Sequence, residues 1–311
     1  MELEKYSALV CAIETGSISA AALKLRYTPS GISRMIASLE MENGFPLLLR
    51  EHDGVRPTEE CKLLLPRIYE MLHSGETYSQ LAAQIRGCEV GSVMIGTAYS
   101  IFYPWLGKIV QAFHRQYPKI QIDFTDGFST GLLEKLNLHQ IDFCIISQRE
   151  GNHKWMPISR DRLLAWVPAA YRFADLPVFP IQYFAEEPYV STFPNMDIDA
   201  TRAFEQYGIR PKQVFSTWNS LATYSMVEAG IGLSLNHEFN AKSWTGSVRM
   251  LPVDPPQIVQ IGVAYLPDIN YASMKFLEVL KEHLHELTPL QPFGAELPFE
   301  GEAKNAIMTG E

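Results

Sequence analysis

The chain contains 311 residues, of which 47% are hydrophobic and 20% charged, and it carries a formal net charge of −9. This composition is typical of a globular protein with enough apolar side chains for a core, and the length allows about two or three domains. No run of about 18 apolar residues occurs, so we expect no membrane helix. The first residues, "MELEKYSALVCAIETGS", lack the basic start of a secretory signal, and we therefore expect a cytoplasmic protein.

The spacing of cysteine and histidine argues against a metal centre or a disulfide framework. The four cysteines lie far apart and form no CxxC pair, so we expect free thiols at Cys11, Cys61, Cys88 and Cys144. The eight histidines show no ligand-like spacing either. We therefore predict no metal, no cofactor and no catalytic group.

The net charge argues mildly against a nucleic-acid-binding protein, which is usually basic on its contact face. Residues 1–58 hold six basic and seven acidic residues, but five of the six bases fall between positions 24 and 56. The position of these bases matters more than their sum, so a local basic surface is still compatible with the sequence.

Short helices are expected near the start of the chain. Apolar residues at helical spacing predict a helix over about 3–15, and a second one follows over about 20–26. Thr28 is a suitable N-cap, and Pro29 a suitable first residue, for a third helix that ends at Gly44.

The open face of this third helix carries only Ser30, Ser33, Arg34 and Ala37. Small side chains allow a helix backbone to lie deep in the major groove of DNA, whereas bulky ones would hold it off. Two short helices joined by a tight turn, the second with such a face, are typical of a helix-turn-helix.

A β-hairpin is expected next. Residues 47–49 predict a short strand, "HDG" predicts a turn, and "VRPT" returns, with Arg50 and Arg56 on either side of the turn. This arrangement resembles a wing, a hairpin whose basic residues reach backbone phosphates.

Thr58 can cap a long helix over about 59–86. The spacing of its small and apolar residues alternates between three and four, which is the heptad pattern of a helix that pairs with another. These residues are Cys61, Leu64, Ile68, Met71, Gly75, Tyr78, Ala82 and Ile85. We favour dimerisation through this helix over packing on its own domain.

Strands and helices alternate over the rest of the chain, which predicts an α/β fold with a mostly parallel sheet. The predicted strands are "SVMIGTA", "KIQIDFTDG", "IDFCIIS", "RLLAWVPA", "PYVST", "KQVFSTW", "GLSLN", "SVRMLPV" and "IVQIGVAYL". Helices are predicted within 102–118, 129–140, 198–207, 220–230 and 271–287. Residues 288–311 show little periodicity, and we expect them to be loose.

Several of these segments resemble LysR-type transcriptional regulators. "GSISAAALKLRYTPSGISRMIASLE" and "GFPLLLREHDGVRPTEECKLLLP" are similar to the winged helix-turn-helix of that family. "YPKIQIDF", "IDFCII" and "VEAGIGLSL" occur where its effector domain has strands and a glycine turn. The chain departs from the family at Pro29, where a base-reading Gln is usual, but phosphate contacts can still position the domain.

The resemblance implies an α/β protein with a winged helix-turn-helix, a linker helix and a two-lobed, Rossmann-like effector domain similar to type 2 periplasmic binding proteins. The implied boundaries are 1–58 for DNA binding, 59–87 for the linker, 88–290 for the effector domain and 291–311 for a disordered tail. Lobe 1 would comprise 88–162 and 266–290, and lobe 2 would comprise 163–265. The implied partners are double-stranded operator DNA, a small-molecule effector, a second or further copy of the chain, and RNA polymerase.

The predicted DNA contacts lie on the third helix and the wing. They are Thr28, Pro29, Ser30, Ser33, Arg34, Arg50 and Arg56. Arg34 could instead be a solvated surface residue, and Ser33 could face the second helix.

Effector contacts are expected at the carboxyl ends of strands and at helix N-termini, where open α/β sheets bind ligands. They are Ala98, Tyr99, Ser100, Ser129, Thr130, Ser147, Thr192, Asn219 and Ser220. Hydroxyls beside helix ends suit an anion such as a carboxylate, although each could merely cap its helix. An aromatic lining is expected from Tyr99, Phe102, Tyr103, Trp105, Phe128 and Trp218.

Other functions fit the sequence less well. "AGIG" lacks the dinucleotide-binding spacing and precedes a strand, and no GxSxG, Walker or HExxH motif occurs. A solute-binding protein would need export and would leave residues 1–86 unexplained. A redox sensor on the same fold would need two cysteines close enough to bridge.

Overall fold

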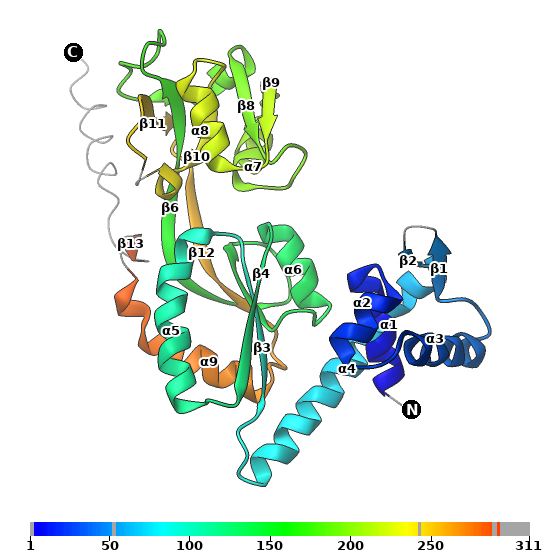
Figure 1. The fold of residues 1–311 in the computed structure, drawn as a ribbon. Helices are drawn as coiled ribbons and strands as arrows, with labels where there is room; N and C mark the ends of the chain where they lie inside the picture. Colours follow the sequence, from blue (N-terminus) through cyan, green and yellow to red (C-terminus); the bar gives the residue numbers. More distant parts are fainter. Residues whose placement is uncertain (1–2, 52–53, 242–243, 288–290, 293–311) are drawn as a thin grey trace. The chain divides into compact units, whose positions relative to one another are not determined.

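The computed structural model describes residues 3–51, 54–241, 244–287 and 291–292 (Figure 1). The chain divides into two compact units. The first comprises Met1–Gly91, Leu138–Gln140 and Asn270–Ala272, and the second comprises Ser92–Asn137, Ile141–Ile269 and Ser273–Glu311. Among the described helices, none combines the length and the apolar content that crossing a membrane requires.

The first unit contains the predicted helices and hairpin. Its elements are α1 (Leu3–Thr15), α2 (Ile18–Leu25), α3 (Pro29–Asn43), β1 (Leu48–Glu51), β2 (Gly54–Pro57) and α4 (Glu59–Ile85). Side-chain caps begin three of these helices. Ser17 accepts from the Ala20 N–H at 3.3 Å, Thr28 from the Gly31 N–H at 3.1 Å, and Thr58 from the Cys61 N–H at 3.0 Å.

Arg26 makes the connection between α2 and α3 tight. It adopts a left-handed conformation with φ 59°, and its N–H bonds back to the carbonyls of Ala22 and Leu23. This ends α2 in the way a C-terminal glycine usually does. The chain therefore turns within a few residues, as a helix-turn-helix requires.

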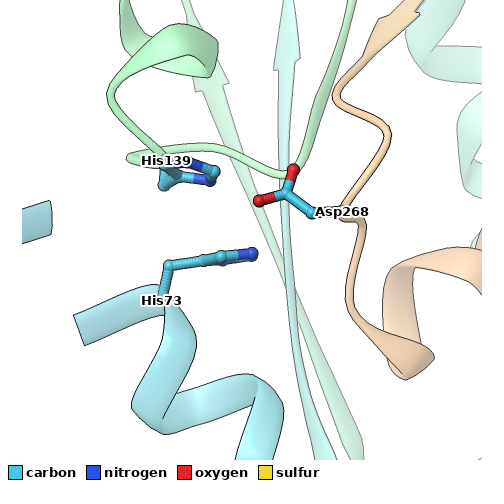
Figure 2. A group of neighbouring side chains, drawn as sticks. All are labelled: His73, His139 and Asp268. Atoms are coloured by element: carbon cyan, nitrogen blue, oxygen red, sulfur yellow. The ribbon is translucent and has the colours of Figure 1, made fainter. Parts of the chain in front are cut away.

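Two histidines that the sequence did not link are brought together in this unit. The rings of His73, on α4, and His139, in the connection after α6, stack with centroids 4.3 Å apart (Figure 2). The contact helps to explain why residues 138–140 cluster with the first unit.

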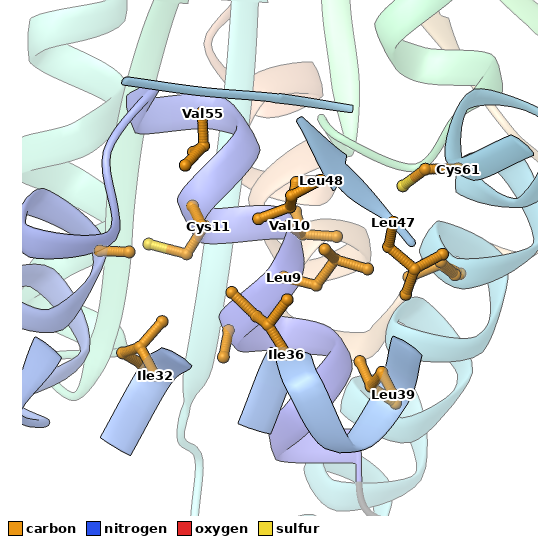
Figure 3. Packing of buried hydrophobic residues seen from close by; sticks show 14 of the residues in the cluster. Leu9, Val10, Cys11, Ile32, Ile36, Leu39, Leu47, Leu48, Val55 and Cys61 are labelled. Carbon is orange, nitrogen blue, oxygen red and sulfur yellow. The ribbon is translucent and has the colours of Figure 1, made fainter. Parts of the chain in front are cut away.

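The core of the first unit determines which side of α3 is open. Ile32, Ile36 and Leu39 are fully buried against Leu9 of α1, with Leu47 beside them (Figure 3). Burial of each such side chain stabilises the fold by about 1.5–3 kcal/mol. The opposite side of α3 is thereby held toward solvent.

The heptad residues of α4 divide into two groups. In the first half, Cys61 and Ile68 are buried in the core of their own unit, and the position of Gly75 is closely approached by Leu3. In the second half, Tyr78 and Ile85 are 75% and 79% exposed. The prediction that α4 pairs with another chain along its whole length was therefore wrong. The heptad residues of its first half pack in the core of their own unit instead.

The second unit contains the predicted alternation of strands and helices. Its strands are β3 (Gly91–Thr97), β4 (Ile120–Asp126), β5 (Phe143–Ser147), β6 (Lys154–Pro168), β7 (Phe179–Pro180), β8 (Pro188–Thr192), β9 (Lys212–Thr217), β10 (Ser234–His237), β11 (Val248–Asp254), β12 (Ile258–Tyr265) and β13 (Gln291–Pro292). Its helices are α5 (Tyr103–Gln116), α6 (Ser129–Asn137), α7 (Asp199–Gln206), α8 (Ser220–Glu228) and α9 (Tyr271–Glu282), with the short turns η1 (Ser100–Phe102), η2 (Ile181–Ala185), η3 (Glu238–Ala241) and η4 (Leu284–Glu286).

The sheet is mixed, which corrects the prediction of a mostly parallel one. β3 and β5 are parallel, but β12 runs antiparallel to both β5 and β6, and β6 runs antiparallel to β10 and β11. The first half of β6, "KWMPISRD", has a proline within its short apolar run and ends in polar and charged residues, so only the second half of β6 was predicted. Antiparallel neighbours need no crossover helix, which is why helix alternation alone could not reveal them.

Two lobes share the long strands β6 and β12 (Figure 1). Lobe 1 contains β3, β4 and β5 with α5, α6 and α9, and lobe 2 contains β7 to β11 with α7 and α8. Separate hydrophobic clusters fill lobe 1, around Leu132, and lobe 2, around Phe184. Of the segment expected to be loose, only Gln291–Pro292 is described, and it pairs with Arg160 and Ser159 of β6.

Candidate DNA-binding surface and effector cleft

The open face of α3 has the composition that the sequence indicated. Ser30, Arg34 and Ala37 are exposed, and Ser33 is half-buried. The Arg34 Nε–H donates to the Ser30 carbonyl at 3.3 Å, which lays the guanidinium along the helix surface. Small side chains around one cation leave the helix backbone accessible to a large polyanion.

The start of α3 is also exposed. The Thr28 hydroxyl accepts from the Gly31 N–H and lies 3.1 Å from the Ser30 hydroxyl. Pro29 is exposed beside it and has no donor to offer to a base edge. This end of the helix therefore presents two hydroxyls at the positive end of the helix dipole, which suit a phosphate.

The hairpin β1–β2 carries the two predicted wing arginines. Its strands pair antiparallel, with Arg50 opposite Val55 and Arg56 opposite Leu49. Val55 is buried, whereas both arginines are exposed, and Arg56 Nε lies 3.4 Å from Glu51 Oε2. The predicted turn residues at 52–53 lie outside the described residues.

A cavity of about 380 Å³ lies between the two lobes of the second unit. It is lined by six of the nine predicted effector residues, namely Ala98, Tyr99, Ser100, Ser129, Thr192 and Ser220. It is also lined by side chains that were not selected from the sequence as effector contacts, among them Asp126, Asp199, Leu235, Asn236 and His237.

Three predicted effector residues lie elsewhere. Asn219 caps α8 and accepts from the N–H groups of Leu221 and Ala222 at 2.8 and 3.2 Å. Ser147 and Thr130 line two other, more open cavities, and each bonds to an aspartate of lobe 2. Helix capping and contact between the lobes therefore account for these polar groups.

Asp199, the first residue of α7, is the centre of a hydrogen-bond network between the lobes. Its carboxylate accepts from the hydroxyls of Tyr99 at 2.7 Å and Ser147 at 2.6 Å, both in lobe 1. It also lies 3.3 Å from the Arg149 guanidinium and 3.1 Å from His237 Nε2. Four donors on one carboxylate leave it fully satisfied.

His237 lies between two carboxylates. Its Nδ1 is 2.8 Å from Asp161 Oδ2, and its Nε2 is 3.1 Å from Asp199 Oδ2. Burial by itself lowers the pKa of His237, but the hydrogen bonds and charges of the two aspartates outweigh it and raise the pKa to about 9. For Asp199, burial acts to raise the pKa, but the hydrogen bond and charge of His237 and the charge of Arg149 outweigh it. The pKa of Asp199 therefore lies well below its usual range.

A second link between the lobes lies beside this network. The Thr130 hydroxyl at the start of α6 donates to Asp197 Oδ2 at 2.6 Å, and Arg202 Nε donates to Asp197 Oδ1 at 2.6 Å. The sequence contained one local signal for this group, because acidic residues favour the N-terminus of a helix such as α7. Nothing local indicated that their partners would come from the other lobe.

The predicted aromatic lining is partly wrong. Phe102 and Trp105 are 1% and 4% exposed and pack in the core, where the Trp105 indole donates to the His283 carbonyl at 2.9 Å. Tyr99 and Phe128 do line the cleft, whereas Tyr103 and Trp218 are not among its lining residues. Phe193, which was not predicted, lines it as well, with its ring centroid 5.0 Å from that of Phe128. Phe193 has a φ of 56°, an uncommon and costly conformation for a bulky side chain.

The cysteines are free, as expected. Cys11, Cys61 and Cys144 are buried, and Cys88 is exposed. Burial raises the pKa of the Cys61 thiol to about 11 and raises the pKa values of the other two buried thiols. A raised pKa disfavours the thiolate, which is the form that reacts with oxidants.

Comparison with known proteins agrees with this architecture. The profile of the "LysR substrate binding domain" matches residues 86–285, and that of the "Bacterial regulatory helix-turn-helix protein, lysR family" matches residues 3–62. The uncharacterized HTH-type transcriptional regulator YvbU of Bacillus subtilis strain 168 is 24% identical over 287 residues, which cover 91% of this chain and 98% of YvbU.

Solved structures share the fold. A full-length OxyR variant from Pseudomonas aeruginosa is similar with a TM-score of 0.69 at 17% identity, covering 96% of this chain and 99% of that one. CbnR, a LysR family transcriptional regulator, is similar with a TM-score of 0.59 at 18% identity, covering 91% of this chain and 99% of that one. Because the two family profiles together span most of the sequence, this chain belongs to the LysR family of transcriptional regulators, with an N-terminal DNA-binding domain and a C-terminal effector-binding domain.

Proposed function

We propose that α3 enters the major groove of operator DNA with Ser30, Ser33 and Arg34 toward the bases. Thr28 and Pro29 would lie at the backbone. The exposed, small-residue face of α3 with its single arginine is the observation that supports this most strongly. CbnR, whose fold this chain shares, has been solved in complex with its target DNA.

Arg50 and Arg56 then contact phosphates from the wing. Both are exposed on the hairpin, and phosphate contacts position a domain on DNA without reading its sequence. Pro29 contributes no hydrogen bond, so base discrimination depends more on Arg34, whose guanidinium can bind the O6 and N7 atoms of a guanine.

The effector binds in the cleft between the lobes, in contact with Tyr99, Ser100, Ser129, Thr192 and Ser220. Ala98 completes the wall. The cavity of about 380 Å³ is within the usual range of small-molecule sites, roughly 300–1,000 Å³. Thr130, Ser147 and Asn219 act indirectly, by holding the lobes or a helix start in place.

Two or more copies of the chain associate through the second half of α4. Tyr78, Leu81 and Ile85 are 75%, 52% and 79% exposed there, which is unusual for large apolar side chains at helical spacing. Pairing of α4 would fix the distance between two copies of α3 and hence the spacing of the two half-sites.

The remaining assignments follow from this function. Residues 1–58 bind DNA, 59–87 link and pair the chains, and 88–290 form the effector domain, with lobe 1 at 88–162 and 266–290 and lobe 2 at 163–265. The protein acts in the cytoplasm, where DNA and RNA polymerase are available. Its role is that of a regulator and not of an enzyme, which is supported by the hydrogen bonds of His237 and Asp199 to each other and to their neighbours.

Selection from random DNA tests the proposal. The purified full-length protein should enrich a palindromic sequence with two half-sites about one helical turn or a multiple of it apart. Absence of any enriched sequence, with or without small molecules, would contradict the assignment of α3 as a recognition helix.

A further inference from the structure

Among the described residues that line the cleft, acidic side chains outnumber basic ones. Among the described lining residues, the charged ones are Asp126, Asp199 and His237, and neither lysine nor arginine is among them. The positive charge of His237 is already held by Asp161 and Asp199, at 2.8 and 3.1 Å. The described wall of the cleft therefore offers an anion no uncommitted cation.

A carboxylate also occupies two of the donors that the sequence suggested for an effector anion. The hydroxyls of Tyr99 and Ser147 both donate to Asp199, and Ser129 Oγ accepts from the Ser147 N–H at 3.1 Å. An anion that used these two hydroxyls would have to displace Asp199 and then remain beside it. Two carboxylates that share one site repel each other, and at least one is then forced toward protonation.

A positively charged ligand group is favoured beside Asp126, which lines the cleft. Asp126 is exposed at the end of β4, where its Oδ1 accepts from the Tyr103 hydroxyl at 2.6 Å. Phe128 follows two residues later and lies edge to face with Phe193, with ring centroids 5.0 Å apart. Aromatic faces attract cations, and a carboxylate beside them adds a direct charge partner.

We propose that the effector of this regulator is a small organic cation, an amine with an apolar body, whose ammonium group binds Asp126 on the same wall of the cleft as the rings of Phe128 and Phe193. The inference rests on the proposed function, because it assigns a ligand class to the same cleft. Leu163 and Leu235 line the inner part of the cavity and receive the apolar body. The constrained backbone of Phe193 holds its ring at the cleft.

Matched ligands that share one apolar group test the ligand class. 2-Phenylethylamine, 2-phenylethanol and 3-phenylpropionate carry a positive, a neutral and a negative group on the same ring. Titration calorimetry on the full-length protein at pH 7 should give an affinity for the amine at least tenfold higher than for the carboxylate, with the alcohol between them. Two further pairs repeat the comparison with other apolar groups. They are benzylamine with phenylacetate and isoamylamine with isocaproate.

Asp126→Asn should weaken amine binding at least tenfold and leave alcohol binding within twofold. Asp123→Asn is the matched control, because Asp123 is exposed on the same strand but does not line the cleft. Tighter binding of the carboxylates, binding of none of the amines, or equal amine affinity in Asp126→Asn would each overturn the proposal.

Gel shifts on the same preparations separate this inference from the proposed function. If a selected operator binds but the amines do not, the ligand class is wrong and the regulator assignment stands. If the amines bind through Asp126 but no DNA sequence is preferred, the ligand class stands and the assignment of α3 fails.

Discussion

Arg34 is the only basic residue in α3. It is exposed, and its neighbours on the same face are Ser30 and Ala37, so no second cation on this face can compensate for its loss. Its predicted role in binding follows from this isolation and from the geometry of a guanidinium, which can bind a guanine edge or a phosphate with two hydrogen bonds.

Arg34→Ala should therefore weaken operator binding by about 1–3 kcal/mol. The measurement is a gel shift at fixed salt concentration. Arg67→Ala is the control, because Arg67 is an exposed arginine of α4 that pairs with Glu70 at 2.7 Å. An unchanged operator affinity in Arg34→Ala, or an equal loss in Arg67→Ala, would remove Arg34 from the contact surface.

His237 makes the stability of the effector domain depend on pH. Its pKa is raised to about 9 in the folded protein by Asp161 and Asp199, against about 6.5 in an unfolded chain. The stabilisation is therefore complete below pH ~6.5, declines as the pH rises, and is lost above pH ~9. Asp199, whose folded pKa is lowered, behaves oppositely: its contribution is complete above pH ~4 and is lost at lower pH.

Thermal unfolding between pH 6 and 10 tests this prediction. The free energy of unfolding of the wild-type effector domain should fall by up to about 3 kcal/mol across that range, because His237 loses its proton. His237→Gln should be less stable than the wild type at pH 6 and should show a flatter profile. Parallel profiles of the two proteins would show that His237 is not charged in the folded state.

At the scale of elements, the helix starts were predicted best. Thr28 and Thr58, the two N-caps expected from the sequence, each accept an N–H three residues ahead, an interaction that depends only on local sequence. The strands were predicted less completely. The first half of β6 was missed because its residues gain their strand conformation from β12 beside it, not from their own pattern.

Helix α4 shows how one pattern can serve two purposes. Its heptad spacing is real, but Cys61 and Ile68 use it within their own unit, and Tyr78 and Ile85 remain exposed. Sequence spacing describes the face of a helix and not the surface that covers it. Only the tertiary structure distinguishes the half that is already packed.

Ile85→Glu should therefore weaken self-association at least tenfold, or about 1.4 kcal/mol, by placing a charge in the paired surface. Light scattering over a concentration series measures the effect. Gln84→Glu is the matched control, since Gln84 is exposed in the same turn. Retention of the wild-type assembly state by Ile85→Glu would move the pairing surface away from the end of α4.

At the scale of the whole molecule, the two units have separate cores. Leu39 is fully buried in the first unit, and Leu132 is fully buried in lobe 1 of the second. Clusters that share no side chains stabilise their own units, so each unit should unfold as its own cooperative transition.

Calorimetry of two core variants tests this independence. Leu39→Ala should lower the free energy of unfolding of the first unit by about 2–5 kcal/mol and leave that of the second unit unchanged. Leu132→Ala should destabilise the second unit by a similar amount and leave the first unchanged. A single transition that both variants shift equally would show instead that the two units unfold together.

The sequence by itself determined where the helices lie, although α6 and α9 end earlier than predicted, together with the open face of α3, the position of the wing arginines and the family. These features depend on residues a few positions apart, whose spacing and caps can be read along the chain. Only the tertiary structure showed that the sheet is mixed, that the first half of α4 packs within its own unit and the second half is exposed, and which charged groups line the cleft. Tyr99 and Asp199 lie 100 positions apart, and their hydrogen bond exists only because two lobes close on the same space. The charge of a binding site is set by such distant neighbours, so it could not be inferred from the local strand and helix ends that predicted where the site lies.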